Sequence, residues 1–384
     1  MAMTHRERVM RALNHQEPDR VPVDFGSTRA SVIAWEAYER LKSHLGVDSQ
    51  TLFMDRTSGR ALPDEIVLEQ FEIDTRMLPS QAPVVRPEGK KLPPFFKDQW
   101  GVTWRLTDDG RYYGTEPPFA GEPSISLLRQ HPWPDPDNPQ LTEGLAIRAR
   151  DLRDRTDCAI VLGLPGRAFS QCQYLCGFEG WLISLVANTR FAEALLDRVV
   201  EIEAQMIENM LKVAGDSVDV VLCPDDMGMQ SSLLLSPRTY RQIVKPRHRR
   251  LFASIKRHTD AKLLLHSDGA IAPILGDLID MGVDVINPVQ VSAAGMGDTK
   301  WLKKEFGNQV SFWGAIDTQH VLPFGSPEDV REEVIRRIED LAPGGGYVLA
   351  SVHTIQAEVP PENICAMFRA AREFGSYDRS GRQA

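Results

Sequence analysis

The chain of 384 residues lacks a long hydrophobic run and a long basic tract, and its number of cysteines is odd. No stretch approaches the roughly 18 consecutive apolar residues that a membrane-spanning helix requires, so we expect no membrane segment. The first ten residues are charged and amphipathic, which argues against a signal peptide. The net charge is −9, and the richest basic run, residues 245–250, fits a solvated helix face. We therefore expect no nucleic-acid partner.

The cysteines are few and show no pairing pattern. There are five, at irregular spacings and without a CxxC motif. This usage is typical of reduced thiols and predicts a cytoplasmic protein without a disulfide framework. Cys172 and Cys176 would share one face of a helix, where we interpret them as core residues rather than metal ligands.

Eight apolar segments predict β-strands that alternate with amphipathic helices. The expected strands are residues 20–26, 71–78, 159–163, 218–223, 261–266, 283–287, 310–314 and 347–351. Several are apolar on both faces, as parallel strands covered by helices must be. This alternation predicts one (β/α)8 barrel, a TIM barrel, over residues 1–384. The main alternative, an open doubly wound sheet, would usually carry a Gly-rich first turn, whereas residues 24–28 read Asp-Phe-Gly-Ser-Thr.

Further local predictions concern two helices near the amino terminus and an insertion that interrupts the alternation of strands and helices. Thr4 and Glu7 form a capping-box pattern that predicts a helix over residues 4–15, and a second helix is expected over 31–45. Residues 80–140 break the alternation, because they are rich in proline and aromatic residues. Asp109-Gly110 between alternating stretches predicts an inserted β-hairpin after the second strand. We expect this insertion to serve as a lid over the barrel mouth or as a contact in a homodimer.

Polar and ionisable residues follow six of the predicted strands. The carboxyl ends of barrel strands meet at one rim, where the active sites of such barrels are built. The catalytic candidates are Asp225, Asp226, Asp317 and His353, and the substrate-binding candidates are Asp24, Arg29, Asn287, Gln290 and Gln319. Adjacent residues at a strand end point apart, so only one of Asp225 and Asp226 is expected to face the cavity. Each residue alone also fits a turn or a helix cap.

The sharpest element is His266-Ser-Asp268, directly after the fifth predicted strand. Side chains at i and i+2 of extended backbone point the same way, so the imidazole and the carboxylate could bind one ion, with His353 as a third ligand. Two nitrogens, one carboxylate and an open position suit zinc or another divalent transition metal. Acid–base use of the same residues without metal, or a purely structural pairing, remain the alternatives. The other histidines, among them His5 and His248, have no convergent partners in the sequence and are interpreted as structural.

Several motifs resemble those of one known superfamily. They are residues 4–22 (THRERVMRALNHQEPDRVP), 98–104 (DQWGVTW), 132–136 (PWPDP), 266–269 (HSDG), 286–290 (INPVQ), 314–319 (GAIDTQ) and 343–347 (PGGGY). With these, the chain resembles the uroporphyrinogen decarboxylase-like superfamily, in particular its branch with corrinoid-dependent methyltransferases. The resemblance covers nearly the whole chain and implies a (β/α)8 barrel.

Two departures from that superfamily shape the functional expectation. Uroporphyrinogen decarboxylases carry an Arg-rich loop for the substrate's carboxylates, whereas residues 24–30 here contain only Arg29. Thiol-methylating members hold zinc with a His-x-Cys pair and a distant Cys. Here His266 matches that His, Asp268 stands in place of the first Cys, and His353 lies near the region of the second.

The resemblance therefore implies a methyltransferase or demethylase. Such an enzyme would move a methyl group from a small methyl–heteroatom donor to a corrinoid on a separate protein, assisted by a metal at His266, Asp268 and His353. The alternatives are a metal-independent decarboxylase of the uroporphyrinogen decarboxylase type and a non-catalytic ligand-binding barrel.

Overall fold

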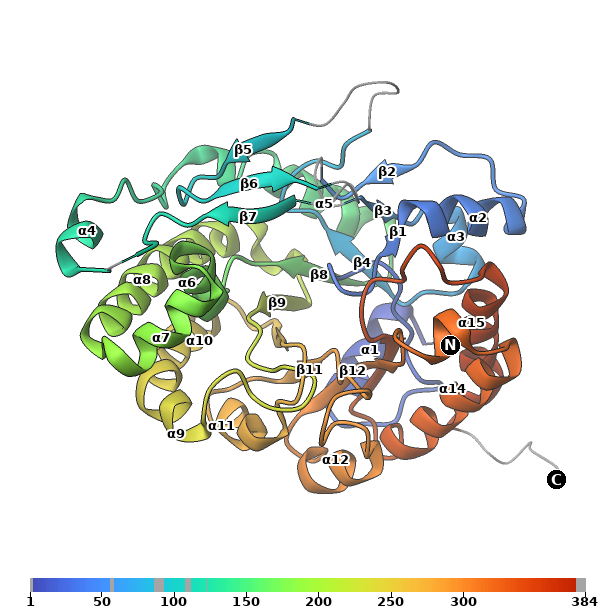
Figure 1. Ribbon diagram of the computed structural model, residues 1–384. Helices are drawn as coiled ribbons and strands as arrows, with labels where there is room; N and C mark the ends of the chain where they lie inside the picture. Colours follow the sequence, from blue (N-terminus) through green and yellow to red (C-terminus); the bar gives the residue numbers. More distant parts are fainter. Residues whose placement is uncertain (1–2, 56–58, 86–92, 108–111, 122, 378–384) are drawn as a thin grey trace.

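A curled parallel sheet forms the centre of the molecule in the computed structural model, which describes residues 3–55, 59–85, 93–107, 112–121 and 123–377 (Figure 1). Its seven strands lie in the order β13-β12-β11-β10-β9-β8-β4, and all neighbours are parallel. They are β4 (Thr75–Leu78), β8 (Ala159–Gly163), β9 (Val220–Pro224), β10 (Lys262–His266), β11 (Val285–Asn287), β12 (Ser311–Ile316) and β13 (Tyr347–Ser351). Seven of the eight predicted strands are thus present: β8 and β13 have the predicted bounds, β12 is longer, and the other four are shorter by one to four residues.

The eighth predicted strand closes the sheet through single hydrogen bonds. Val23 makes a parallel bridge to Leu349 of β13, and Asp24 N donates to Leu349 O at 2.9 Å. On the other side, Asp74 N donates to Val23 O at 2.9 Å, just before β4. Residues 22–24 therefore fill the gap between the two edge strands. Pro22 offers no N–H to the ladder, which keeps this segment short. The predicted (β/α)8 barrel is confirmed.

Helices surround the sheet (Figure 1). On the barrel they are α5 (Leu145–Arg155), α6 (Ala168–Cys176), α7 (Phe178–Ala187), α8 (Thr189–Ala214), α9 (Pro237–Thr239), α10 (Lys245–His258), α11 (Leu275–Ile279), α12 (Thr299–Phe306), α13 (Val321–Phe324), α14 (Pro327–Leu341) and α15 (Pro361–Phe374). Four short turns, η1 (Pro139–Leu141), η2 (Gly215–Ser217), η3 (Tyr240–Val244) and η4 (Ala272–Ile274), complete them. No helix among the described residues is long and apolar enough to cross a membrane.

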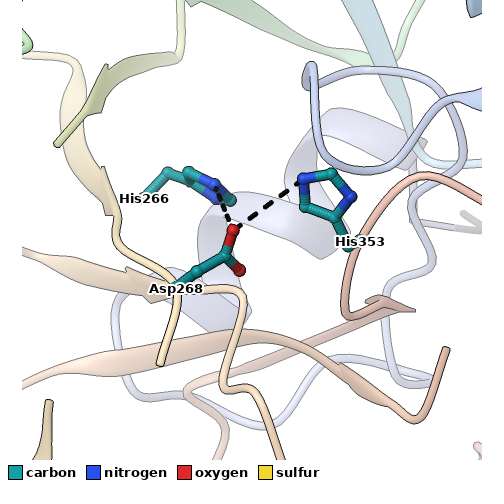
Figure 2. Close-up of side chains that lie close together, drawn as sticks. All are labelled: His266, Asp268 and His353. Atoms are coloured by element: carbon teal, nitrogen blue, oxygen red, sulfur yellow. Dashed lines mark ion pairs between the residues drawn. The ribbon is translucent and has the colours of Figure 1, made fainter. Parts of the chain in front are cut away.

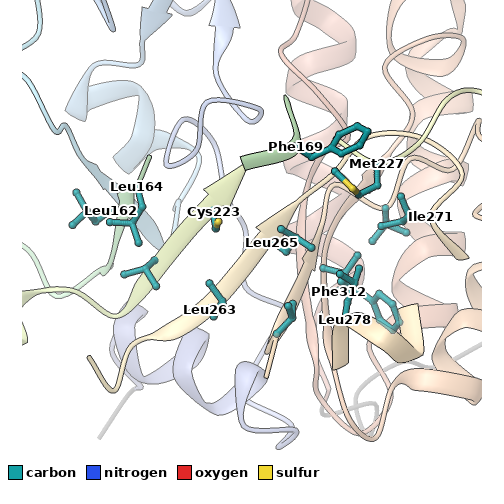
Figure 3. Close-up of a cluster of buried hydrophobic side chains, with 14 of the residues drawn as sticks. Leu162, Leu164, Phe169, Cys223, Met227, Leu263, Leu265, Ile271, Leu278 and Phe312 are labelled. Atoms are coloured by element: carbon teal, nitrogen blue, oxygen red, sulfur yellow. The ribbon is translucent and has the colours of Figure 1, made fainter. Parts of the chain in front are cut away.

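The strands bury both faces, in two separate apolar clusters. Leu263 and Leu265 belong to the larger cluster between the sheet and the helices (Figure 3). Leu264 belongs to a smaller cluster of inward-facing strand residues, which Val9 and Leu13 of α1 (His5–Leu13) complete. The predicted capping box at Thr4 and Glu7 starts that helix, which packs against β8 and β13. Because side chains alternate along a strand, the residue two beyond Leu264 also points inward. That residue is His266.

Two small antiparallel sheets lie outside the barrel. The predicted insertion contains β5 (Phe95–Lys97), β6 (Thr103–Leu106) and β7 (Tyr112–Glu116), so the hairpin β6–β7 has a third strand beside it. Its proposed Asp109-Gly110 turn lies outside the described residues. Trp104 of β6 packs on Tyr174 of α6, with 5.0 Å between ring centroids. The short helix α4 (Ile125–Gln130) follows.

The other small sheet was not predicted. It consists of β1 (Ile33–Ala34), β2 (Leu52–Phe53) and β3 (Arg60–Leu62). Ile33 pairs with Ala61 and bridges Ile355, so the predicted helix over 31–45 begins only at α2 (Trp35–Leu45). Helix α3 (Glu65–Gln70) leads from this sheet to β4. Strand β1 therefore joins β3 to the loop that carries His353, because Ile33 contacts both Ala61 and Ile355.

Candidate metal centre at the barrel mouth

His266, Asp268 and His353 lie together at the carboxyl end of the sheet (Figure 2). His266 ends β10, Asp268 follows two residues later, and His353 follows β13. Asp268 Oδ2 is 3.6 Å from His266 Nε2 and 3.8 Å from His353 Nε2. One ligand atom from each side chain lies within 4.8 Å of the others, the one group of this kind in the described part of the chain. The sequence-predicted trio is therefore brought together in space.

Electrostatics ties this trio to a fourth residue, Asp226. Burial alone would lower the pKa of His266, but the charges of Asp268 and Asp226 and the contact with Asn287 raise it to about 9. Burial would raise the pKa of Asp268, but the charges of His266, His353 and Arg60 lower it. For Asp226, burial and the charge of Asp268 raise the pKa against the opposing charge of His266. The mouth thus places two carboxylates beside one histidine that favours a positive charge.

Close backbone contacts hold the loop after β9, which carries Asp226, against the loop after β10, which carries Asp268. Asp225 N donates to His266 O at 2.8 Å, and Asp268 N donates to Asp226 Oδ1 at 2.9 Å. Gly228 and Gly269 touch directly, because a Cβ on Gly269 would lie 2.4 Å from the carbonyl carbon of Gly228. Gly269 also has φ +89°, a conformation that favours glycine. Only glycines allow the loops to approach closely enough for Asp226 to contact the Asp268 backbone.

Asp225, by contrast, is occupied with structural bonds away from the trio. Its carboxylate is buried and accepts from Phe169 N at 2.8 Å and from Ser170 N at 2.7 Å, at the start of α6. His248 Nε2 lies 2.9 Å from its Oδ2. The interpretation that His248 has no partner was therefore wrong, since its partner comes from a distant strand end. Asp226 is the member of the pair that faces the site.

Asp317 and Asp24 also use their oxygens within their own surroundings. Asp317 Oδ1 accepts from the backbone N–H of Gln319 at 2.6 Å and of His320 at 3.0 Å, which is the Asx-turn alternative. Asp24 is buried and accepts from Trp313 Nε1 at 2.9 Å and from Thr75 Oγ1 at 2.7 Å. Neither carboxylate belongs to the His266 cluster, so the sequence reading of Asp317 as catalytic and Asp24 as substrate-binding finds no geometric support.

The remaining substrate-binding candidates are spread over the mouth. Arg29 is exposed, with its guanidinium 3.2 Å from Asp55. Gln290 accepts from Gly269 N at 2.8 Å and donates to Gln230 Oε1 at 3.0 Å, and Gln319 Nε2 lies 3.4 Å from the same oxygen. Gln290 thus forms a hydrogen bond with the loop that carries Asp268.

Asn287 is wholly buried and contacts His266 rather than the cavity. Its Oδ1 lies 2.6 Å from His266 Nδ1, and its Nδ2 donates to Trp313 O at 3.0 Å. A direct contact of Asn287 with substrate stays a prediction. Register explains the placement, because Asn287 and His266 are paired residues of neighbouring parallel strands.

Sequence reasoning missed three other contributors. Ser170 follows the third barrel strand, and its hydroxyl donates to Asp225 Oδ1 at 2.7 Å and accepts from Asp226 N at 3.1 Å. Gln230 lies two residues beyond Gly228, in the same loop as Asp225 and Asp226, so the signal for it is a polar residue later in that loop. Arg60 comes from β3, outside the barrel, and no pattern in the sequence indicated that its charge reaches Asp268.

The cluster fits a divalent transition metal. His266 Nδ1 faces the oxygen of Asn287, so its Nε2 faces the oxygen of Asp268, and a metal cation between them would take the place of the proton that His266 otherwise binds. Ligand atoms about 2.0–2.2 Å from zinc can be no more than about 4.4 Å apart, a separation that small side-chain rotations would reach. The side chains of Asp268 and His353 are 32% and 35% exposed, which leaves open coordination positions accessible.

A family model described as uroporphyrinogen decarboxylase (URO-D) matches residues 112–374, which include the whole cluster. The chain belongs to the uroporphyrinogen decarboxylase family. Among curated relatives, methylated-thiol–coenzyme M methyltransferase of Methanosarcina mazei is 24% identical over 67% of this chain and 65% of that protein. Uroporphyrinogen decarboxylase of Alkalilimnicola ehrlichii is 22% identical over 97% of this chain and 95% of that protein.

The fold agrees with that of a solved structure. A structure described as a methyltransferase from Methanosarcina mazei superposes with a TM-score of 0.66 at 20% identity, over 97% of this chain and 99% of that one. This likeness supports the barrel fold. The recognised superfamily is confirmed as well, and it contains both methyltransferases and decarboxylases among the relatives.

Proposed function

We propose that this protein is a metal-assisted methyltransferase or demethylase, which moves a methyl group from a small methyl–heteroatom donor to a corrinoid carried by another protein. The observation that carries the proposal is the convergence of His266, Asp268 and His353, with ligand atoms within 4.8 Å of one another. A methyltransferase among the relatives supports the reaction class. The methyl–heteroatom donor and the corrinoid acceptor are further parts of our proposal, beyond the reaction class that this relative supports.

The three side chains would hold zinc or another divalent transition metal. When bound, such a metal supplies Lewis acidity toward the leaving heteroatom, more strongly with a His–Asp–His donor set than with thiolates. We therefore expect an oxygen donor, such as a methyl ether, rather than a thioether. The half-exposed edge formed by Asp268 and His353 is where the donor would approach.

The chain's own residues supply the proton balance. In the proposed reaction the methyl–oxygen bond breaks with its electron pair remaining on oxygen. The reduced cobalt of the corrinoid supplies the pair for the new carbon–cobalt bond, and the leaving alkoxide gains one proton. Asp226 is the candidate donor, because its carboxyl group lies next to the cluster, with Oδ1 2.9 Å from Asp268 N. Asp225 and Asp317 already accept several backbone bonds and orient loops instead.

Elemental analysis of the purified full chain tests the metal. We expect about one divalent transition metal per chain in the wild type, lost in Asp268→Ala and His353→Ala. The matched control is His320→Ala, an exposed histidine after β12 that lies outside the cluster. Methyl transfer from methoxylated donors to a reduced cobalamin is then measured in all four proteins. Ordinary turnover by His353→Ala would rule the proposal out.

A second candidate is decarboxylation without metal. It is favoured by the family description and by decarboxylases that align over nearly the full chain. In that case Asp226 and His353 would exchange protons with the substrate. Its substrate would need fewer carboxylates than a uroporphyrinogen, because residues 24–30 offer only Arg29. Activity unchanged by chelators, in protein without metal, would favour this candidate.

A further inference from the structure

Asn287 connects the candidate metal centre to the interior of the barrel. It is the last residue of β11, it is fully buried, and it pairs in register with His266 at the end of β10. Its backbone oxygen accepts from Ser267 N at 2.9 Å. Its side chain reaches His266 Nδ1 on one side and Trp313 O on the other. Both its main chain and its side chain therefore fix the segment that carries the first ligand.

The partners of this amide determine which way it points. Trp313 O is a carbonyl and can only accept, so the atom 3.0 Å from it must be the NH2 group of Asn287. The amide oxygen then faces His266, 2.6 Å from Nδ1, and this oxygen can only accept as well. Nδ1 of His266 must carry a hydrogen. The other ring nitrogen, Nε2, is left to face Asp268 at 3.6 Å.

We propose that Asn287 is a positioning residue: it holds His266 in the tautomer that presents Nε2 to a metal, and it thereby sets the metal affinity of the cluster. The proposal rests on the proposed function only in requiring a metal at this cluster, and not on the methyl-transfer chemistry. The partner of the second nitrogen of a ligating histidine selects the tautomer and fixes the ring, and losing such partners typically weakens metal binding by about 10–100-fold.

Substitutions of Asn287 separate its acceptor oxygen from its volume. Asn287→Leu keeps a similar size but removes the acceptor, and we expect zinc to bind about 10–100-fold more weakly. Asn287→Asp keeps an acceptor toward His266 and, when protonated on its other oxygen, a donor toward Trp313 O. We therefore expect it to bind zinc within roughly threefold of the wild type or more tightly. A merely structural role would not be rescued by Asp.

A second buried asparagine provides the matched control. Asn363 of α15 is equally buried and donates to the backbone carbonyls of Leu322 and Gly325 at 2.9 and 2.8 Å, but does not contact the cluster. Asn363→Leu should leave zinc affinity unchanged. Affinity is measured on the full-length proteins by competition with a chromophoric chelator, after circular dichroism has confirmed folding.

The outcomes distinguish this inference from the proposed function. Equal zinc affinity in the wild type and Asn287→Leu, or equally weak binding in Asn287→Leu and Asn287→Asp, would overturn the positioning role. If Asn287→Leu does not fold, Asn287→Asp decides alone, since binding more than tenfold weaker than the wild type contradicts the proposal. Zinc affinity that follows the expected order while no donor is demethylated would sink the methyltransferase proposal and leave the positioning role intact. A wild type that binds neither zinc nor another divalent transition metal overturns both.

Discussion

The two ends of the barrel use the same residue type in opposite ways. At the amino end of the sheet, Asp74 is buried and accepts from Arg8 at 2.6 Å, Arg20 at 2.7 Å and Val23 N at 2.8 Å. His5, interpreted from the sequence as lacking a partner, also lies 2.7 Å from it. At the carboxyl end, Asp226 and Asp268 lie next to each other and share the charge of His266. At the amino end, which we call the floor of the barrel, positive side chains neutralise the carboxylate. At the carboxyl end, the mouth, two carboxylates lie close to each other.

The pKa values follow this difference. Burial would raise the pKa of Asp74, but the hydrogen bond from His5 and the charges of Arg20 and Arg8 hold it below its ordinary value. The pKa of Asp226 is raised instead. Satisfied ion pairs at the amino end contribute to stability, whereas a carboxylate with a raised pKa next to a second carboxylate is typical of functional sites. Substitutions at the two ends should therefore differ in their effect on the free energy of unfolding.

The largest effect is expected at the floor. Asp74→Ala leaves two arginines and a histidine without their buried counter-charge, and we expect a loss of about 3–5 kcal/mol in the free energy of unfolding. Urea unfolding followed by circular dichroism measures it. Asp151→Ala, which removes an exposed carboxylate 3.6 Å from Arg155, is the control and should change stability by less than about 0.5 kcal/mol. A loss below 1 kcal/mol for Asp74→Ala would contradict the stabilising role of the floor.

A buried carboxyl group for which burial outweighs the nearby positive charge should behave oppositely. Glu203 of α8 is buried and its Oε2 has no hydrogen-bond partner, and burial with the nearby Asp225 raises its pKa to about 8 from 4.5 against the charge and the backbone N–H of Arg167. The folded state therefore keeps a proton that the unfolded chain releases. Stability is highest below the unfolded pKa and falls as the pH rises toward 8, by up to about 1.4 kcal/mol per pH unit.

Glu203→Gln removes this titration while keeping the shape of the protonated acid. At pH 8 we expect the variant to be more stable than the wild type by a few kcal/mol, and at pH 5 the two should be close. Urea unfolding at pH 5, 6, 7 and 8 measures the difference. Parallel curves for the two proteins would show that Glu203 is already ionised in the folded state.

Periodicity made the barrel and part of its mouth predictable. The strands were found because apolar runs of five to eight residues recur between amphipathic helices, and His266 and Asp268 were paired because extended residues at i and i+2 share a side. His353 joined them only through closure of the barrel, which brings β13 round to the strand-end rim. Local pattern and fold class together therefore sufficed for the three metal-ligand candidates.

Inter-strand register decided what the sequence left open. Asp225 and Asp226 are equivalent by pattern, but only the structure shows that Asp225 is bound by the start of α6 and by His248. The sequence predicted a contact of Asn287 with substrate, and its contact with His266 could not be predicted. That contact depends on how β10 and β11 align, which the sequence does not show. The sheet β1–β3–β2 has strands of two or three residues, too short to show any period.

The glycine contact at the mouth should have a smaller effect on stability than the floor does. In Gly269→Ala, the new Cβ would lie 2.4 Å from Gly228 C at φ +89°, so the two loops must separate. We expect a loss of about 1–3 kcal/mol in the free energy of unfolding and weaker zinc binding. Gly46→Ala has φ +70° but nothing within 4 Å, so it should cost only about 1 kcal/mol and leave zinc affinity unchanged. Equal effects would show that backbone strain, not the loop contact, matters at Gly269.

The smallest effect on stability is expected for Asp268→Ala, the mouth counterpart of Asp74→Ala. Removing Asp268 leaves His266 with Asp226 as a neighbouring counter-charge and relieves the repulsion between two carboxylates. In the presence of a chelator we expect the free energy of unfolding to change by less than about 1 kcal/mol, in either direction. Excess zinc should then separate the proteins, since a ligand at 100 times its Kd stabilises the wild type by about 2.7 kcal/mol and the variant not at all. A metal-free loss as large as that of Asp74→Ala would mean that the mouth carboxylate serves the fold, and the contrast between the two ends of the barrel would no longer hold.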